Sequence, residues 1–270
     1  MREDVTGVDT GSGDTWASGD YGRVGNLWLL VGELLCEAAP VRAGDRVIDV
    51  ATGTGNTALA AARRSCVVTG VDYVPGLLER ARVRAAAEGL EVAFETGDAR
   101  RLGHPDGSFD VAVSTFGVQY VPDHRGTADE LLRVVRPGGR IAVASWAPDG
   151  YLGELLRLVE QYTAGSAGPP APTLWGTAKH VEDLFGPHVS ALDCTERQWR
   201  FRFRSPADMV GWFRSYFGPL TVAFGALDGD GREALTADLT RYVNRHNLAD
   251  DGTVDVPSTY LEAVAVTPAG

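Results

Sequence analysis

The sequence predicts an α/β fold built on a doubly wound, mostly parallel sheet. Over residues 45–147, apolar runs of strand length alternate with segments of helix length. Strands joined by helix-length connections pair in parallel through right-handed crossovers, with helices on both faces of the sheet. A chain of 270 residues is long enough for one large domain of this class with a modest additional cap.

Each expected element has a local signal. Gly89 closes a helix, Pro137 and the two glycines after it end another, and Trp199, Phe201 and Phe203 alternate with arginines in a half-buried strand. Strands are expected at residues 46–51, 66–72, 91–98, 109–116, 140–146, 190–203 and 258–266. Helices are expected at residues 56–64, 75–89, 128–135 and 151–163 and within 206–247.

The segments on either side of this alternation differ from it in composition. The first fourteen residues hold Gly, Ser, Thr and Asp with almost nothing to bury, which predicts a disordered tail. Leucines recur at helical spacing after Trp16, and aromatic residues crowd the stretch after residue 206. We therefore expect a tail at 1–14, a helical entry segment at 15–44, a ligand-binding core at 45–147, its completion at 148–205, a helical cap at 206–257, and a closing strand and tail at 258–270.

Composition narrows the possible partners. The formal net charge of −11 disfavours nucleic acid and anionic membrane surfaces, so a small-molecule partner is expected. No apolar stretch resembles a signal peptide or a membrane span, and three separated cysteines indicate reduced thiols in the cytoplasm. The five histidines lack metal-ligand spacing, so no metal is expected. The sequence leaves the oligomeric state open.

The stretch VIDVATGTGN (47–56) carries the strongest functional signal. A strand reaches Asp49 and then turns through Gly53 and Gly55 into a helix. In open parallel sheets ligands bind beyond the carboxyl ends of strands, where glycines admit a close approach and a helix offers N–H groups. A nicotinamide dinucleotide fits, because Asp72 follows Gly53 by 19 residues. S-adenosylmethionine fits as well, because its ribose needs the same acid.

Three aspartates at the ends of successive strands favour the second ligand. Asp49 would repel a pyrophosphate but suits an ammonium group, and Asp98 offers an acceptor for an adenine amino group. Any one of these aspartates could simply cap a turn or a helix. Asp49, Asp72 and Asp98 together indicate a binding site.

These motifs are similar to those of a known family. The stretches DVATGTG (49–55), VTGVD (68–72), GDA (97–99), 107–124 and 131–146 resemble, in order and spacing, the class I S-adenosylmethionine-dependent methyltransferases, especially the branch of the ubiquinone/menaquinone C-methyltransferases. The rest of the chain resembles, less specifically, bacterial small-molecule methyltransferases of specialised metabolism. The resemblance implies a seven-stranded Rossmann-like sheet, N-terminal entry helices, a helical cap inserted before the last strand, and S-adenosylmethionine as cofactor.

The resemblance also implies roles for individual residues. Gly53 and Gly55 would approach the methionine moiety above Asp49, and Asp72 would bind the ribose hydroxyls. The expected adenine contacts are Tyr73, Asp98 and Ala99, and the expected contacts on the sulfur side run from Ser114 to Phe116. The candidate substrate contacts are Tyr21, Gln119, Trp146, Tyr216 and Phe217. For Tyr21, Tyr216 and Phe217 the alternative is core packing, and for Gln119 it is an ordinary surface amide.

The predicted reaction is transfer of a methyl group to a small aromatic or apolar molecule by in-line displacement. The acceptor atom can be carbon, nitrogen or oxygen, with carbon slightly favoured, and no catalytic residue can be named. One alternative, an NAD-dependent oxidoreductase, lacks the expected Tyr-x-x-x-Lys pair, because Lys179 is the only lysine. The other is a non-methylating relative that keeps the cofactor as a bound ligand.

Overall fold

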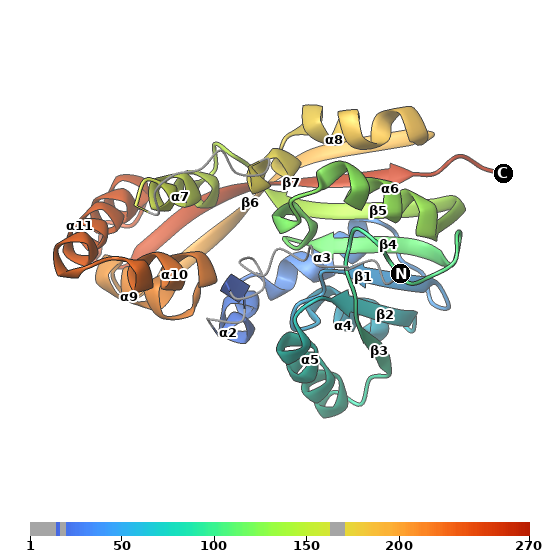
Figure 1. Cartoon of the computed structure of the whole chain (residues 1–270), viewed down its shortest axis with the longest axis horizontal. Coiled ribbons are helices and arrows are strands. Elements are labelled where there is room, and N and C mark those ends of the chain that lie inside the picture. Colours follow the sequence, from blue (N-terminus) through green and yellow to red (C-terminus); the bar gives the residue numbers. More distant parts are fainter. Residues whose placement is uncertain (1–14, 17–19, 163–170) are drawn as a thin grey trace, which may run out of the picture.

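A seven-stranded sheet in the order β3-β2-β1-β4-β5-β7-β6 forms the centre of the molecule (Figure 1). The structure is a computed structural model that describes residues 15–16, 20–162 and 171–270, so the expected tail at 1–14 lies outside the described residues. The strands are β1 (Arg46–Val50), β2 (Val67–Asp72), β3 (Val92–Thr96), β4 (Phe109–Thr115), β5 (Val135–Trp146), β6 (Ala191–Phe203) and β7 (Val254–Val266). Strands β1 to β5 are parallel, and β7 runs antiparallel to β5 and β6. The predicted fold class is confirmed.

Helices cover both faces of this sheet. They are α2 (Tyr21–Asn26), α3 (Leu29–Ala38), α4 (Asn56–Arg63), α5 (Pro75–Ala87), α6 (His124–Val134), α7 (Tyr151–Glu160), α8 (Ala178–Phe185), α9 (Pro206–Tyr216), α10 (Gly218–Ala226) and α11 (Gly229–His246), with the short 3-10 turns η1 (Val118–Tyr120), η2 (Pro172–Gly176) and η3 (Gly186–His188). Helices α3, α4 and α5 pack on one face and α6 and α8 on the other (Figure 1).

The side chains of β5 show why helices pack on both faces of the sheet. Ala142 and Ala144 belong to the core beneath α3 and α4, whereas Ile141 and Val143 belong to the core beneath α6 and α8. Successive side chains of a strand point to opposite faces, so a strand that is apolar throughout is buried on both. The near-continuous apolar runs of the sequence are therefore central strands.

The helical cap is carried by a ribbon that extends past the rest of the sheet. Strands β6 and β7 pair over their full length, from Ala191 with Val266 to Phe203 with Val254, but β5 ends where Trp146 pairs with Tyr260. Residues 254–259 therefore project beyond the carboxyl end of β5. Helices α9, α10 and α11 connect the far ends of β6 and β7, and α7 packs beside them (Figure 1). Strand β7 begins earlier than its expected start at residue 258, because this ribbon is longer than β5.

Gly55 has a conformation that other residues resist. It precedes α4 with a φ of 84°, and a Cβ there would lie 3.2 Å from both Ala81 Cβ and Phe94 Cζ. We expect Gly55→Ala to lower the free energy of unfolding by about 1–3 kcal/mol. The matched control is Gly76→Ala in α5, where nothing lies within 4 Å, and it should be neutral or stabilising by up to about 1 kcal/mol. Urea unfolding followed by circular dichroism measures both, and equal effects would contradict the assignment.

Candidate active site

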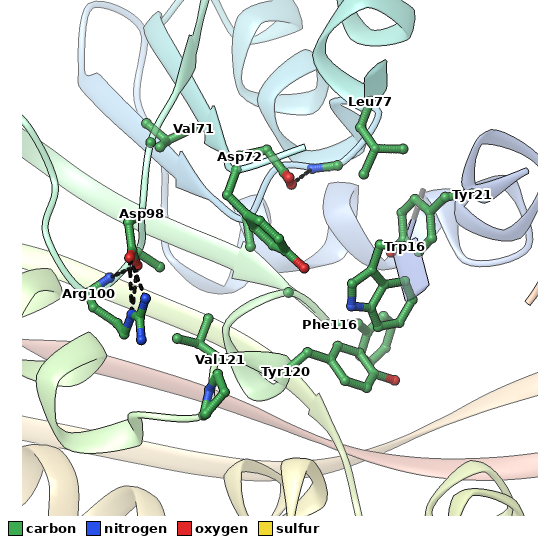
Figure 2. A pocket seen from close by; sticks show the side chains of 17 residues that line it. Trp16, Tyr21, Val71, Asp72, Leu77, Asp98, Arg100, Phe116, Tyr120 and Val121 are labelled. Atoms are coloured by element: carbon green, nitrogen blue, oxygen red, sulfur yellow. Dashed lines mark hydrogen bonds and ion pairs between the residues drawn. The ribbon is translucent and has the colours of Figure 1, made fainter. Parts of the chain in front are cut away.

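A cavity opens at the carboxyl ends of β1, β2, β3 and β4, at the place where the strand order reverses between β1 and β4 (Figure 2). Ligands of open α/β sheets bind at such a position. The empty space of this cavity, its open mouth included, is about 930 Å³. Its lining consists of Trp16, Tyr21, Ala51, Gly53, Val71, Asp72, Tyr73, Leu77, Gly97, Asp98, Ala99, Arg100, Phe116, Gly117, Tyr120, Val121 and Pro122.

Asp49 lies beneath the glycine turn and does not line this cavity. Its side chain is 1% exposed, and Oδ2 accepts hydrogen bonds from Thr52 Oγ1 at 2.6 Å and from the Ala58 amide at 2.9 Å. Burial raises the pKa of Asp49 to about 7, against the opposing effect of these two hydrogen bonds. Its carboxylate therefore joins the turn after β1 to the first turn of α4.

Asp72 connects the end of β2 to the same turn. Its Oδ2 accepts a hydrogen bond from the Gly53 amide at 2.8 Å, and Oδ1 accepts one from the Val74 amide at 2.9 Å. Burial raises the pKa of this carboxyl. A carboxylate offers about four acceptor positions, so Asp72 keeps acceptor capacity toward the cavity that it lines.

The end of β3 contributes Asp98 and Ala99, and Tyr73 lines the cavity from the end of β2. Asp98 is paired with Arg100, whose Nη2 lies 2.7 Å from Oδ2 and whose amide donates to Oδ1 at 2.9 Å. These hydrogen bonds hold the pKa of Asp98 below its usual range, so the carboxylate stays an acceptor. Sequence reasoning missed Arg100, although it follows directly after the GDA motif.

Aromatic rings form the opposite side of the cavity. A Cβ at Gly53 would lie 2.9 Å from Cε1 of Tyr21, so the ring of Tyr21 rests on the glycine turn, where φ is 56°. Trp16 packs against Tyr21 and Tyr120, with ring centroids 5.5 Å and 4.5 Å apart. Trp16 and Tyr120 were also missed. Tyr120 belongs to the quoted stretch 107–124, and its place in the segment that follows the carboxyl end of β4 was a usable signal.

Several expected contacts lie one layer behind the cavity wall. Ser114 is fully buried, with Oγ donating to the Val50 carbonyl at 2.7 Å and accepting from the Val118 amide at 3.1 Å. Gln119 is 1% exposed and accepts from the Trp146 amide at 2.8 Å. The Trp146 ring stacks on the ring of Phe116, with centroids 3.9 Å apart. The expectation that Ser114, Gln119 and Trp146 face a ligand is therefore corrected: they support Phe116 and the turn after β4.

The two cap residues expected at the substrate also lie outside the lining. Phe217 is 1% exposed and touches Trp16, with ring centroids 6.2 Å apart. The hydroxyl of Tyr216 accepts a hydrogen bond from Arg23 Nη1 at 3.2 Å. Gly55 is absent from the lining too, since it faces α5 and β3. Among the described residues, the cap contacts the cavity wall through Trp16, which packs on Phe217, and through α2, where Arg23 binds Tyr216.

Comparison with known proteins agrees with this geometry. The family model described as a methyltransferase domain matches residues 47–139. The chain is 39% identical over 226 residues to an uncharacterized protein of Mycobacterium tuberculosis, covering 83% of this chain and 82% of that protein. It is 39% identical over 127 residues to the demethylmenaquinone methyltransferase of Deinococcus radiodurans, covering 46% of this chain and 53% of that enzyme. The crystal structure of a putative methyltransferase from Bacillus halodurans superposes with a TM-score of 0.61 at 18% identity, covering 88% of this chain and 98% of that one.

The chain belongs to the class I S-adenosylmethionine-dependent methyltransferases. The match to the Deinococcus enzyme indicates the ubiquinone/menaquinone-like branch of this family. The cofactor of the family is S-adenosylmethionine. Among the described residues of the methyltransferase, no group of three or more His, Cys, Asp or Glu side chains could hold a metal ion. No described helix is both long and apolar enough to cross a membrane.

The raised pKa of Asp49 predicts a pH dependence of stability. Between its ordinary pKa near 4 and its folded pKa of about 7, the folded methyltransferase binds more protons than the unfolded chain. The contribution of Asp49 to the free energy of unfolding therefore decreases as the pH rises through this window. We expect wild type to lose stability relative to Asp49→Asn from about pH 4 to about pH 7 and the difference then to level off.

Urea unfolding of both proteins at several pH values measures this difference. Asp255→Asn is the control with the opposite sign, because hydrogen bonds from Arg200 hold the pKa of Asp255 below its usual range. Wild type should gain stability relative to that variant as the pH rises through the acidic range. Identical pH slopes for wild type and Asp49→Asn would contradict the prediction.

Proposed function

We propose that this methyltransferase transfers the methyl group of S-adenosylmethionine to a small aromatic or apolar molecule by in-line displacement. One observation carries the proposal. The acids Asp72 and Asp98, at the ends of β2 and β3, line the same cavity as the Gly53 turn and a wall of aromatic rings. The acceptor can be carbon, nitrogen or oxygen, with carbon slightly favoured by the resemblance to C-methyltransferases. The alternative of a relative that binds the cofactor without methylating is separated from this one by turnover.

The residues present fit the cofactor. Asp72 has acceptor capacity for ribose hydroxyls, and Asp98, Ala99 and Tyr73 line the same cavity, which supports their assignment to the adenine ring. The glycine turn is covered by the Tyr21 ring so closely that a side chain at Gly53 would not fit. The Tyr21 ring would therefore have to move for the methionine moiety to approach the backbone of Gly53. Asp49 would act through the turn that it holds and not by direct contact.

Methyl transfer from a sulfonium depends more on the alignment of the two reactants than on acid or base catalysis. When bound, S-adenosylmethionine supplies a methyl group on a sulfur that is already a good leaving group. The protein then has to bring the acceptor into line and keep water out. The Trp16, Tyr21, Phe116 and Tyr120 rings can do both, since they make the reacting side of the cavity apolar.

The proposal also includes a small-molecule partner and a location in the cytoplasm. The net charge of −11 supports a small-molecule partner over nucleic acid or an anionic membrane surface. Cys36, Cys66 and Cys194 are free thiols, and burial raises the pKa of Cys36 to about 12, which leaves it unreactive. Free thiols are compatible with the cytoplasm. The less specific resemblance to bacterial methyltransferases of specialised metabolism supports a substrate that belongs to specialised metabolism.

The cofactor assignment predicts a selective stabilisation. S-adenosylmethionine at about 100 times its dissociation constant should stabilise the folded protein by about 2.7 kcal/mol through mass action. NADH at the same concentration should leave the melting temperature unchanged. Differential scanning calorimetry measures both. Stabilisation by NADH without stabilisation by S-adenosylmethionine would refute the proposed function.

The ribose contact predicts a loss of affinity in Asp72→Ala. Removing a charge-assisted acceptor that also holds the Gly53 amide should weaken binding of S-adenosylmethionine at least about tenfold. The matched control is Asp228→Ala, because Asp228 also accepts a backbone amide, that of Gly231, but in the cap. Isothermal titration calorimetry on folded preparations of wild type and both variants measures the affinity for S-adenosylmethionine. If Asp72→Ala bound S-adenosylmethionine as tightly as wild type, the assignment of Asp72 to the ribose would be contradicted.

A further inference from the structure

The outer edge of strand β6 is open. Among the described strands, β6 is the last in the sheet order and pairs with β7 alone, without a break in register from Ala191 to Phe203. Its 13 residues contain neither proline nor glycine, whereas most strands of globular proteins have about 5–6 residues. Proteins usually shorten, interrupt or cover an edge strand, because its free N–H and C=O groups pair readily with a further strand. β6 is therefore a long and regular edge that can accept another strand.

The hydrogen bonds of β7 show which backbone groups of β6 point to this edge. The Ala147 amide donates to the Thr259 carbonyl at 3.1 Å, so the odd-numbered residues of β7 bond toward β5. Residues of an antiparallel strand bond alternately to its two sides, and the even-numbered residues of β7 therefore bond to β6. Because Ser258 pairs with Trp199, it is the odd-numbered residues of β6 that bond to β7. The even-numbered residues direct their N–H and C=O groups outward, and these are Leu192, Cys194, Glu196, Gln198, Arg200 and Arg202.

Helices cover each end of the open edge on one face only. Leu192 and Cys194 pack against the core that α8 covers. Phe201 and Phe203 point to the opposite face and pack against Phe213 of the cap, with ring centroids 5.8 Å and 6.0 Å apart. Figure 1 shows α8 toward one end of the β6–β7 ribbon and the cap at the other. A second copy turned end for end would therefore place its α8 and the cap of the first copy on opposite faces.

The charged side chains of β6 favour a second copy of this chain as the partner. Arg197 and Arg200 are already paired with acids of β7, at 3.0 Å and 2.7 Å. Glu196 and Arg202 are exposed, and neither forms an ion pair with a described residue. Because the acid precedes the base along the strand, an antiparallel copy brings each acid to the base of the other chain. A parallel copy in register would instead align like charges.

Symmetry restricts the possible registers. Opposed residues of two antiparallel strands have their side chains on the same face, and a two-fold axis perpendicular to the sheet preserves the faces. An even-numbered residue of β6 must therefore oppose an even-numbered one. Glu196 and Arg202 meet this condition, and opposing them places Trp199 on the axis. Gln198 then opposes Arg200 of the partner subunit, so no like charges face each other along this stretch.

We propose that two copies of the chain pair antiparallel through β6, around a two-fold axis at Trp199, and join their sheets into one. Glu196 meets Arg202 of the partner subunit on each side of the axis. Trp199 is only partly buried in one chain, and its ring would be covered by the partner's Trp199. The proposal goes beyond the proposed function and does not depend on it.

Charge reversal tests the pairing. Wild type should sediment with twice the mass of one chain in analytical ultracentrifugation. Glu196→Arg and Arg202→Glu each turn the two attractive pairs of the dimer into repulsive ones, and each should weaken dimerisation by roughly five- to a hundredfold. The double variant restores opposite charges and should recover most of the lost affinity. The matched control, Glu91→Arg, makes the same charge change just before β3, at the other edge of the sheet, and should dimerise as wild type does.

A proline at Gln198 tests the backbone bonds. The Gln198 amide points to the open edge, so Gln198→Pro removes no bond to β7 and suits an edge strand. It should fold with a melting temperature close to that of wild type and remain monomeric. If this variant does not fold, the charge reversals still decide, because both side chains are exposed and unpaired within one chain.

A wild-type protein that stays monomeric up to about 100 μM overturns the proposal. A dimer that survives in folded Gln198→Pro and in both single charge reversals overturns it as well, since the interface would then lie elsewhere. Loss of the dimer in the single reversals without recovery in the double variant contradicts the pairing of Glu196 with Arg202 and overturns the proposed axis.

Discussion

Two buried carboxylates hold the turn after β1, and the shape of the cavity depends on that turn. Asp49 accepts from Thr52 and from the first turn of α4, while Asp72 accepts from Gly53 across the neighbouring strand. Burying a carboxylate is costly unless hydrogen bonds compensate, so these bonds restrict the backbone around them. Ala51 and Gly53 both have positive φ, at 55° and 56°. The turn consequently presents backbone, not side chains, to Tyr21 and to the cavity.

The turn after β4 is held differently and meets the first one directly. Phe116 has a φ of 55°, and a Cβ at Gly117 would lie 2.6 Å from the Ala51 carbonyl oxygen. A left-handed conformation costs a non-glycine residue of order 1–3 kcal/mol. Stacking on Trp146, whose amide is bound by Gln119, offsets this cost in a fully buried environment. The two strained turns meet where the strand order reverses, and the floor of the cavity is therefore preorganised.

The sequence allowed the fold and the acids of the site to be predicted, but not which side chains face the cavity. Strand periodicity and turn residues located β1 to β5, and the aspartates that end β1, β2 and β3 followed from them. Ser114 and Gln119 lie close in sequence to the lining residue Phe116, yet both are buried and bind backbone groups of neighbouring strands, and the left-handed Phe116 lies between them. Hydrophobic patterns do not encode such a turn. Trp16 packs against Tyr120 and Phe217, which are distant from it in sequence, as well as against Tyr21.

Asp72 and the rings that line this cavity impose the same requirement on a ligand as Asp49, which lies beneath the glycine turn. Burial shifts the pKa values of Asp49 and Asp72 upward, so their ionised forms are stabilised by any positive charge that enters nearby. Ring faces favour positive charge through their quadrupoles and need no counter-ion. Arg100 does not compensate these two acids, because its guanidinium is paired with Asp98. A cation therefore relieves a cost already present in the folded protein, whereas a pyrophosphate would increase it, which is why the glycine turn favours a sulfonium cofactor over a dinucleotide.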